Sequence, residues 1–456
     1  MLKELPETLD ETYERILKDI NKANRDLAHR LLQCLTVAVR PLRVAELAEV
    51  LAVDFGTGSR GGRSKLNTDW RWEDQEEAVL STCSSLISVV DEDSGQVVQF
   101  SHFSVKEFLT SSRISDSSAD VSRYRILLEP AHTNLAKTCL GVLLRLDGFL
   151  GDGNVEDKFP LARYAAKHWV DHAQFENVAS HIREGMEDLF DPDKPYFAAW
   201  LHVHDIDTLS SHKLVLYWFR LTHKDSNTAT PLYYAALCGF YDLVEQLLIK
   251  HPQQVNTTGG YYVSPLGAAL NGGHFKIAQL LYDRGAEVDV QGRGNRTPLY
   301  GASSSGCLEI AEWLLSRGAN LAVQVKPDSD WTPLHAAAYH GYVEVSRLLL
   351  QYKADINAQC LIGRTPLHEA SEDQHVNVHV ARLLLEHGAD VNARDDNRCT
   401  PLLRSLMFGR TEVAHLLVEH GANIDAEDDK GRTAFQVASE NGHHDFAKFL
   451  SNHGSK

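Results

Sequence analysis

Residues 331–358 read WTPLHAAAYHGYVEVSRLLLQYKADINA, and this stretch decides the fold of the C-terminal half of the chain. Thr332 can cap a helix, and Pro333 suits the first turn of one. Gly341 can adopt the left-handed conformation that ends a helix. The apolar positions after Gly341 predict a second helix with one buried stripe. The stretch therefore predicts two helices joined by a short turn.

The same pattern recurs along the C-terminal half at a nearly fixed period. The helix-starting pairs follow one another at spacings of 34, 33, 35, 33, 35 and 33 residues; they are Thr230-Pro231, Ser264-Pro265, Thr297-Pro298, Thr332-Pro333, Thr365-Pro366, Thr400-Pro401 and Thr433-Ala434. A period of this size is typical of stacked repeats. Seven phased copies resemble the ankyrin repeat. The resemblance implies stacked helix pairs whose turns project to one side, and polar residues in the last repeat unit suggest an end cap.

The N-terminal part shows helices followed by a hairpin. Helical patterns cover residues 5–20, 25–39, 44–53 and 72–86, and the segment 54–70 has the composition of a loop. Apolar runs on either side of the turn residues Asp91 to Gly95 predict a two-stranded hairpin over residues 86–101. This order predicts a winged-helix-like domain. Arg43 and Glu46 are interpreted as a surface ion pair of its third helix.

Winged helices often bind DNA, so that class of function must be weighed. The helix before the wing would enter the major groove. Here it carries Glu73, Asp74, Glu76 and Glu77, and no Lys or Arg follows Arg71. The net charge of the whole chain is −17. Carboxylates would face phosphates, so neither nucleic acid nor an anionic membrane is the expected partner.

A wider resemblance rests on LPETLDETYERIL (5–17), RPLRVAELAEVLAV (40–53), CSSLISVV (83–90) and VVQFSHFSVKEFL (97–109). These stretches look like the region after the nucleotide-binding domain in fungal NACHT–ankyrin proteins, a branch of the STAND signalling ATPases. Residues 122–222, with LEPAHTNLAKTCLGVL (128–143), resemble the helical connector of those proteins. The resemblance implies a sensor or signalling role.

The ATPase motif of that family is missing from this sequence. A P-loop requires Gly-Lys followed by Ser or Thr, and the chain has no Gly-Lys pair. In STAND proteins a histidine at the end of the wing contacts the bound diphosphate, and His102 occupies the corresponding place. Without a nucleotide-binding module we expect His102 to bond its own helix start. Whether the chain is naturally whole or lacks an upstream module stays open.

Other chemical motifs in the sequence are weak. Gly56, Gly58 and Gly61 match G-x-G-x-x-G, but no strand–helix unit surrounds them. The histidine groups 202, 204 and 212 (with Asp205 and Asp207) and 375 and 379 include no cysteine, and we interpret them as structural. We expect no cofactor, no metal and no enzyme; an unrecognised enzyme stays an alternative. No segment is long enough to span a membrane, and the start shows no secretory signal. The seven dispersed cysteines indicate a reducing compartment.

The sequence thus predicts a mainly α protein with three parts: a winged-helix-like domain (1–114), a helical connector (115–225) and seven ankyrin repeats (226–456). We expect a non-enzymatic, cytoplasmic or nuclear scaffold that binds a protein ligand on the concave side of the repeats. The alternative is the regulatory portion of a NACHT ATPase, acting with a nucleotide-binding module. Residues before each Thr-Pro and at the end of each first helix should contact the partner: Arg296, Trp331, Tyr339, His340, Arg364, Glu372, Asp373, Met407 and Phe408.

Overall fold

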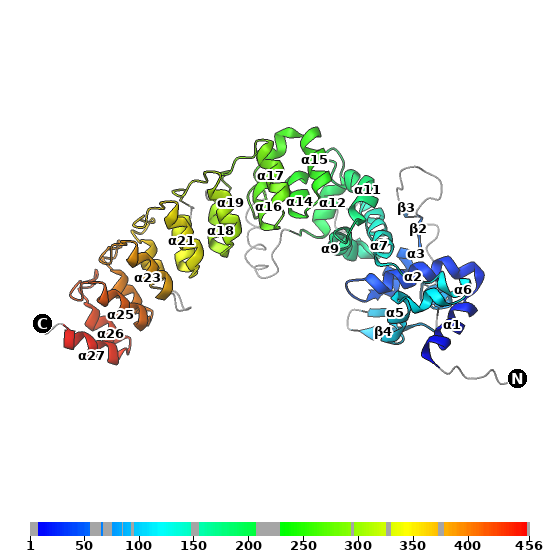
Figure 1. Ribbon diagram of the computed structural model, residues 1–456, viewed down its shortest axis with the longest axis horizontal. Helices are drawn as coiled ribbons and strands as arrows, with labels where there is room; N and C mark the ends of the chain where they lie inside the picture. Colours follow the sequence, from blue (N-terminus) through cyan, green and yellow to red (C-terminus); the bar gives the residue numbers. More distant parts are fainter. Residues whose placement is uncertain are drawn as a thin grey trace. The chain divides into compact units, whose positions relative to one another are not determined.

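The computed structural model describes residues 8–54, 65–66, 75–83, 85–92, 95–146, 155–206, 229–292, 296–324, 330–372 and 378–453. The chain divides into two compact parts, Met1–Lys224 and Asp225–Lys456. Helices dominate both parts (Figure 1), so the predicted mainly α fold class is confirmed. No helix within these ranges is long and apolar enough to cross a membrane. The predicted boundary at residue 114 stays a prediction.

The first part begins with a winged-helix arrangement. Its elements are α1 (Leu9–Asp19), η1 (Lys22–Asn24), α2 (Arg25–Val37), β1 (Leu42–Arg43), α3 (Val44–Leu51), α4 (Gln75–Cys83), β4 (Ile87–Glu92), β5 (Gly95–Phe100) and α5 (Phe103–Thr110). The three strands form an antiparallel sheet in the order β1-β5-β4, with Leu42 opposite Val98. Strand β5 buries Val97 and Val98 against the helices. The hairpin was predicted, whereas β1 was not, because two residues show no alternation.

Two sequence interpretations of this domain are wrong. The segment 54–70 was expected to be loop throughout, but β2 (Val53–Asp54) pairs with β3 (Lys65–Leu66). Glu46 was expected at the surface, but its side chain is fully buried. Arg40 Nη2 lies 2.6 Å from Glu46 Oε1, and Arg43 donates its backbone N–H to Glu46 Oε2 at 2.8 Å. The apolar residues around Glu46 bury α3 on both sides, which a short amphipathic pattern does not reveal.

The helical connector packs directly on the winged-helix domain. It contains η3 (Arg113–Asp116), α6 (Ala119–Ser122), α7 (Leu128–Leu143), α8 (Val155–Lys158), α9 (Ala162–Ala173), α10 (Val178–His181), α11 (Arg183–Leu189) and α12 (Tyr196–Val203). The backbone N–H of Leu161 donates to Glu49 Oε2 of α3 at 2.7 Å. Within the connector, Trp169 and Trp200 meet edge to face with centroids 5.5 Å apart. Both indoles are fully buried and centre the core.

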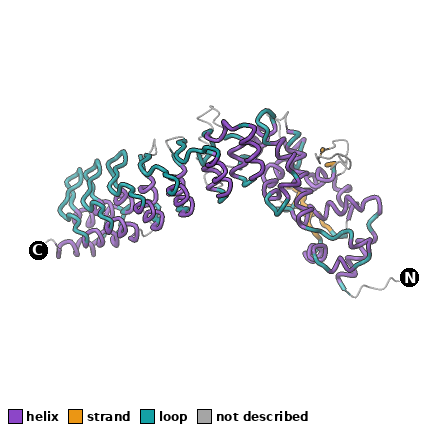
Figure 2. Tube along the Cα trace, turned by 45° about the horizontal axis from the view of Figure 1, so that its top comes forward, coloured by secondary structure: helices purple, strands orange, loops and turns teal. Residues whose placement is uncertain are grey.

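The second part is an array of helix pairs that stack in chain order. The pairs are α14 (Pro231–Leu237) and α15 (Tyr241–Lys250); α16 (Pro265–Asn271) and α17 (Phe275–Asp283); α18 (Pro298–Ser305) and α19 (Leu308–Leu315); α20 (Pro333–Tyr339) and α21 (Val343–Gln351); α22 (Pro366–Ala370) and α23 (Val378–Glu386); α24 (Pro401–Met407) and α25 (Thr411–Glu419); α26 (Ala434–Glu440) and α27 (His444–His453). A short helix, η5 (Pro252–Asn256), follows α15. Figure 2 shows the turns of the later repeat units projecting to one side of the helices, as expected.

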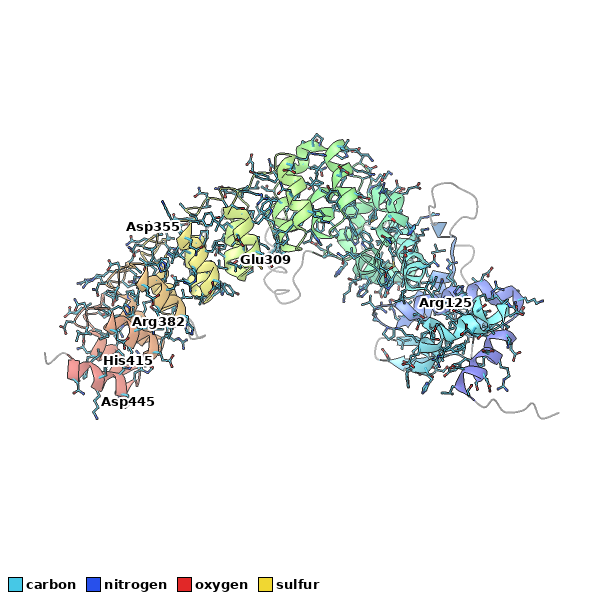
Figure 3. All side chains as sticks on the ribbon, viewed as in Figure 1. Arg125, Glu309, Asp355, Arg382, His415 and Asp445 are labelled. Carbon is cyan, nitrogen blue, oxygen red and sulfur yellow. The ribbon has the colours of Figure 1, made fainter. Side chains whose placement is uncertain are left out.

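Second helices of neighbouring repeat units contact one another. Glu309, Arg382 and His415, labelled in Figure 3, belong to the second helices α19, α23 and α25. The imidazole of His415 lies against Phe446 of α27, with ring centroids 4.7 Å apart.

The seventh repeat unit departs from the polar end that we expected. Phe435 is 46% exposed, whereas the leucine at this position in every other repeat unit is buried.

Candidate partner-binding surface on the first helices of the repeats

Every first helix of the array starts with a side-chain cap. Ser264 Oγ accepts the backbone N–H of Gly267 at 3.2 Å, and Thr297 Oγ1 accepts that of Tyr300 at 3.2 Å. In the seventh repeat unit the backbone N–H of Thr433 donates to Gln436 Oε1 at 2.8 Å. These bonds satisfy helix-end donors that would otherwise lack partners. The caps therefore fix where each first helix begins, and so where its exposed end lies.

Two histidines tie neighbouring repeat units together. The Nδ1 of His335 accepts the backbone N–H of Thr332 at 3.3 Å, so its Nε2 carries the proton and donates to the Arg364 carbonyl at 3.0 Å. His368 repeats this arrangement with the Cys399 carbonyl at 3.1 Å. Burial lowers the pKa of both histidines to about 4. Both rings are therefore neutral structural links and are not available to a ligand.

We call the residue before each capping Thr or Ser, together with the seventh and eighth residues after the cap, the inner surface. The structure brings the first two of these positions together within a repeat unit. Arg364 Nη1 lies 3.1 Å from Glu372 Oε2, and Arg432 Nη1 lies 3.1 Å from Glu440 Oε2. The sequence pattern alone gives these positions as two separate sets. The eight-residue contact joins the two positions within a repeat unit.

In the fourth repeat unit the inner surface is aromatic. The rings of Trp331 and Tyr339 lie 5.0 Å apart, and the ring of Tyr339 lies 5.1 Å from that of His340. Trp331 and Tyr339 are half-buried, and His340 is exposed. An aromatic pair thus stands where the fifth and seventh repeat units have an ion pair. Partly exposed aromatic rings that support one another suit the centre of a protein interface.

In the fifth repeat unit the inner surface is charged and partly buried. Glu372 also accepts a hydrogen bond from Arg404 Nη2, so its carboxylate lies between two guanidinium groups. The side chains of Arg364 and Glu372 are only 18% and 20% exposed. These two predicted contact residues therefore act first as an internal ion pair, with one edge reaching solvent.

The remaining predicted contact residues are scattered over the array. Phe408 is 41% exposed and lies under the guanidinium of Arg404, whose Cζ is 5.4 Å from the ring centroid. Met407 is half-buried, and Arg296 is exposed in the third repeat unit. Asp373 lies outside the described residues. The structure thus groups Trp331, Tyr339 and His340, and separately Arg364 and Glu372.

His102 caps helix α5 after the wing. Its Nδ1 accepts the backbone N–H of Ser104 at 3.2 Å and lies 2.6 Å from Ser104 Oγ. Tyr13 Oη lies 2.7 Å from the same Ser104 hydroxyl, which joins α1 to the start of α5. The ring is exposed, and none of the described residues bonds its Nε2. Here His102 bonds its own helix start, as we expected of the chain alone.

Other sequence candidates do not gather into a chemical site. Among the described residues no group of three His, Cys, Asp or Glu side chains could hold a metal ion. Gly56, Gly58, Gly61, Asp207, His212 and His375 lie outside the described residues. All seven cysteines are free thiols, and burial raises the pKa of Cys34 and Cys83 to about 12.

One buried carboxylate beside the inner surface was not predicted from the sequence. Glu369 lies one turn before Glu372, is fully buried, and has Arg364 Nη1 3.8 Å from its Oε1. Burial raises the pKa of Glu369 to about 7. The only available signal was a glutamate after TPLH, where three other repeat units carry Ala or Gly. That signal does not distinguish a buried carboxylate from an exposed one.

Comparison with known protein families identifies one domain type in each part of the chain. The model for ankyrin repeats matches three times, over residues 232–325, 321–395 and 379–456. The model described as GPI inositol-deacylase, winged helix domain, matches residues 13–121. Ankyrin repeats are protein–protein interaction modules and are typically non-catalytic.

A curated fungal protein is similar to a large part of the chain. It is azaphilone pigments biosynthesis cluster protein L of Monascus ruber, 32% identical over 290 residues, which are 60% of this chain. The match covers 58% of the relative, so the chain spans less than two thirds of that protein. The name of this relative states no enzymatic activity. Together the two family matches show that this chain carries a winged-helix domain of the GPI inositol-deacylase type and an array of ankyrin repeats.

Proposed function

We propose that the inner surface of the ankyrin array binds a protein ligand, with its centre at Trp331, Tyr339 and His340 and a second contact at Met407 and Phe408. The edge of the Arg364–Glu372 ion pair lies between these two groups in the chain and adds polar specificity. Arg296 extends the surface into the third repeat unit. Trp, Tyr, Met and Arg, which supply most of this surface, are enriched at interface centres, and the polar neighbours suit the rim.

One observation carries this proposal. At the eight-residue contact of the inner surface, the fifth and seventh repeat units form Arg–Glu ion pairs, but the fourth forms Trp331–Tyr339 at 5.0 Å. The ion pairs demonstrate that the fold accepts polar side chains here. Aromatic side chains are therefore not required for stacking, and a half-exposed aromatic pair favours binding.

The test compares three forms of the full chain as bait for binding proteins. These are the unaltered chain, Trp331→Ala, and Tyr352→Ala as a matched control, because Tyr352 is 42% exposed but lies outside the inner surface. We expect a protein that binds the unaltered chain and the control but not Trp331→Ala, and that binds again when both partners are purified. A ligand retained equally by all three forms would contradict the proposal.

The signalling context is part of the same proposal. We infer that the chain acts in a STAND-like, NACHT-associated pathway, supported by the winged-helix match and by the wing, connector and repeat order. The exposed Nε2 of His102 favours a second role as the regulatory portion of a NACHT ATPase, in which a nucleotide-binding module meets the start of α5. The seven free thiols support a reducing compartment such as the cytoplasm.

A further inference from the structure

The joint between the fifth and sixth repeat units holds five charged side chains. Arg364, Glu369 and Glu372 come from the fifth repeat unit, and Asp395 and Arg404 come from the turn and first helix of the next. We call these five residues the joint cluster. The exposed fractions of the side chains of Glu369 and Asp395 are 1% each, and that of Arg404 is 8%. These three side chains are therefore almost completely removed from solvent, while Arg364 and Glu372 reach it at one edge.

The hydrogen bonds of the joint cluster are unevenly shared. Glu372 bonds both guanidinium groups, and Asp395 Oδ1 accepts the backbone N–H groups of Asn397 and Cys399 at 3.0 and 2.8 Å. Within the described residues neither carboxylate oxygen of Glu369 has a hydrogen-bond partner. Its nearest cation, Arg364, lies 3.8 Å away, too far for a hydrogen bond.

The charges of the joint cluster do not balance when every group is ionised. Within the joint cluster two guanidinium groups face three carboxylates, which leaves one uncompensated negative charge. A third guanidinium, that of Arg410, donates from its Nε to the backbone carbonyl of Glu372 at 3.4 Å rather than to a carboxylate of the cluster. Burying an uncompensated charge is costly unless it is paired and hydrogen-bonded. If Glu369 keeps a proton, two cations face two anions and the cluster is neutral. Since Glu369 lacks hydrogen bonds, it is the carboxylate that gains most from that proton.

We propose that Glu369 makes the joint between the fifth and sixth repeat units proton-sensitive: its neutral form closes the joint, and its ionised form loosens it. The inference rests on the proposed function in one respect: a partner bound to the inner surface would bind with a different affinity when the joint loosens. Arg364 and Glu372 belong to both the joint cluster and the inner surface, so loosening the joint alters the surface that a partner meets.

Other titratable groups around the joint do not replace Glu369. Helix α20 contributes His335, and α22 itself contributes His368. Burial lowers the pKa of both histidines to about 4, so both rings are neutral over the pH range of interest. The turns contribute Cys360 and Cys399, and burial raises the pKa of each thiol. Burial also raises the pKa of Asp395, but its Oδ1 accepts two backbone N–H groups that favour the ionised form, which Glu369 lacks. On α23, His379, Arg382 and Glu386 are exposed. Burial raises the pKa of Glu369 to about 7, which places its titration near neutrality.

The test is hydrogen–deuterium exchange of the full chain between pH 5.5 and 8.5, without any partner. The measured quantity is the opening constant of the amides of α22 and α24, after correction for intrinsic exchange. Glu369→Gln keeps the shape of the neutral form and cannot ionise. The ratio of the opening constant in the unaltered chain to that in Glu369→Gln cancels the contribution of the histidines. We expect this ratio to rise roughly 30-fold over the range, as linkage predicts for a carboxyl whose pKa is 4.5 in the open form and about 7 in the closed form.

Two further variants keep the test decisive. Glu372→Gln removes one of the competing anions, so Glu369 should ionise at lower pH and the rise in the opening constant should move to lower pH. Glu412→Gln, an exposed carboxyl on α25, should behave like the unaltered chain. A ratio that stays constant with pH, or a Glu372→Gln variant with an unmoved transition, would overturn the proposal. Because no partner is present, failure of the proposed binding function would leave this result unaffected.

Discussion

The guanidinium of Arg364 lies 3.1 Å from the carboxylate of Glu372, eight residues further along the chain. The same spacing brings Trp331 to Tyr339 in the preceding repeat unit. One position pair of the ankyrin unit thus holds an ion pair in one place and an aromatic pair in another. Both first helices begin with Pro after a capping Thr, although α20 ends at Tyr339 and α22 at Ala370. The fold therefore accepts either kind of pair at these two positions.

Buried His335 should make the array less stable in acid. Its pKa falls from 6.5 to about 4 on folding because of burial, so the unfolded chain takes up a proton first as the pH falls. Stability is therefore complete above pH 6.5 and is lost between pH 6.5 and about 4, by about 3 kcal/mol for this residue. Urea unfolding of the full chain and of His335→Gln at several pH values measures the difference.

Glutamine is the matched replacement at this position because Gln436 already caps the seventh repeat unit. It keeps the cap and does not titrate. The stability advantage of the unaltered chain over His335→Gln should shrink on acidification. An advantage that is independent of pH would show that His335 is not held neutral.

Alanine substitutions at Gly306 and Gly318 distinguish the cost of backbone strain from the cost of a steric clash. Both have positive φ, 74° and 83°, but a Cβ on Gly306 would lie 2.6 Å from the Tyr342 ring, whereas one on Gly318 meets nothing within 4 Å. Gly318→Ala should cost about 1–2 kcal/mol for its conformation alone. Gly306→Ala should cost a further 1–3 kcal/mol or so because the ring must move. Thermal unfolding that ranks the two variants equally would refute the close approach of Tyr342.

Glu46 should be essential to the winged-helix domain. Burial alone would raise its pKa, but hydrogen bonds from Arg40 and from the Arg43 backbone outweigh that and lower the pKa. Its contribution is therefore present above the unfolded pKa and is lost as the pH falls through the folded value. Glu46→Ala leaves Arg40 without its carboxylate and leaves Arg43 with Glu156 as a carboxylate partner, 3.4 Å away, and should cost about 3–5 kcal/mol.

The control for Glu46 is Lys18→Ala, because Lys18 forms a partly exposed i,i+4 pair with Glu14 at 3.3 Å. Such pairs contribute about 0.3–0.5 kcal/mol. Chemical denaturation followed by far-ultraviolet circular dichroism compares the two variants. Similar losses in both would mean that Glu46 is no more important than a surface residue.

His102→Ala should destabilise α5 through the lost cap, by about 1 kcal/mol, while His102→Asn should restore most of it. The chain alone should give no heat in a calorimetric titration with ADP. If a nucleotide-binding module is joined to this chain, His102→Ala should also speed ADP release from the complex. An unchanged release rate would leave His102 with the structural role only.

The sequence predicted some features well because each depends on local residues. Thr332 and Pro333 define a helix start whatever surrounds them, so the periodic starts predicted the stacked helix pairs. The charge environment of Glu46 and Glu369 depends in part on residues distant in sequence. Examples are Glu156, which pairs with Arg43, and Arg404, which pairs with Glu372. Strand β1 likewise exists only because Leu42 pairs with Val98. Local patterns cannot reveal such contacts.

Partner affinity of the inner surface tests the central claim most directly. Once a ligand has been isolated, calorimetric titration should be run on the unaltered chain, Trp331→Ala, Phe408→Ala and the control Tyr352→Ala, with melting temperatures measured alongside. We predict that the two inner-surface variants each lose about 1–3 kcal/mol of binding free energy, that Tyr352→Ala binds normally, and that all four melt alike. Normal binding by both inner-surface variants, or their unfolding, would contradict the account.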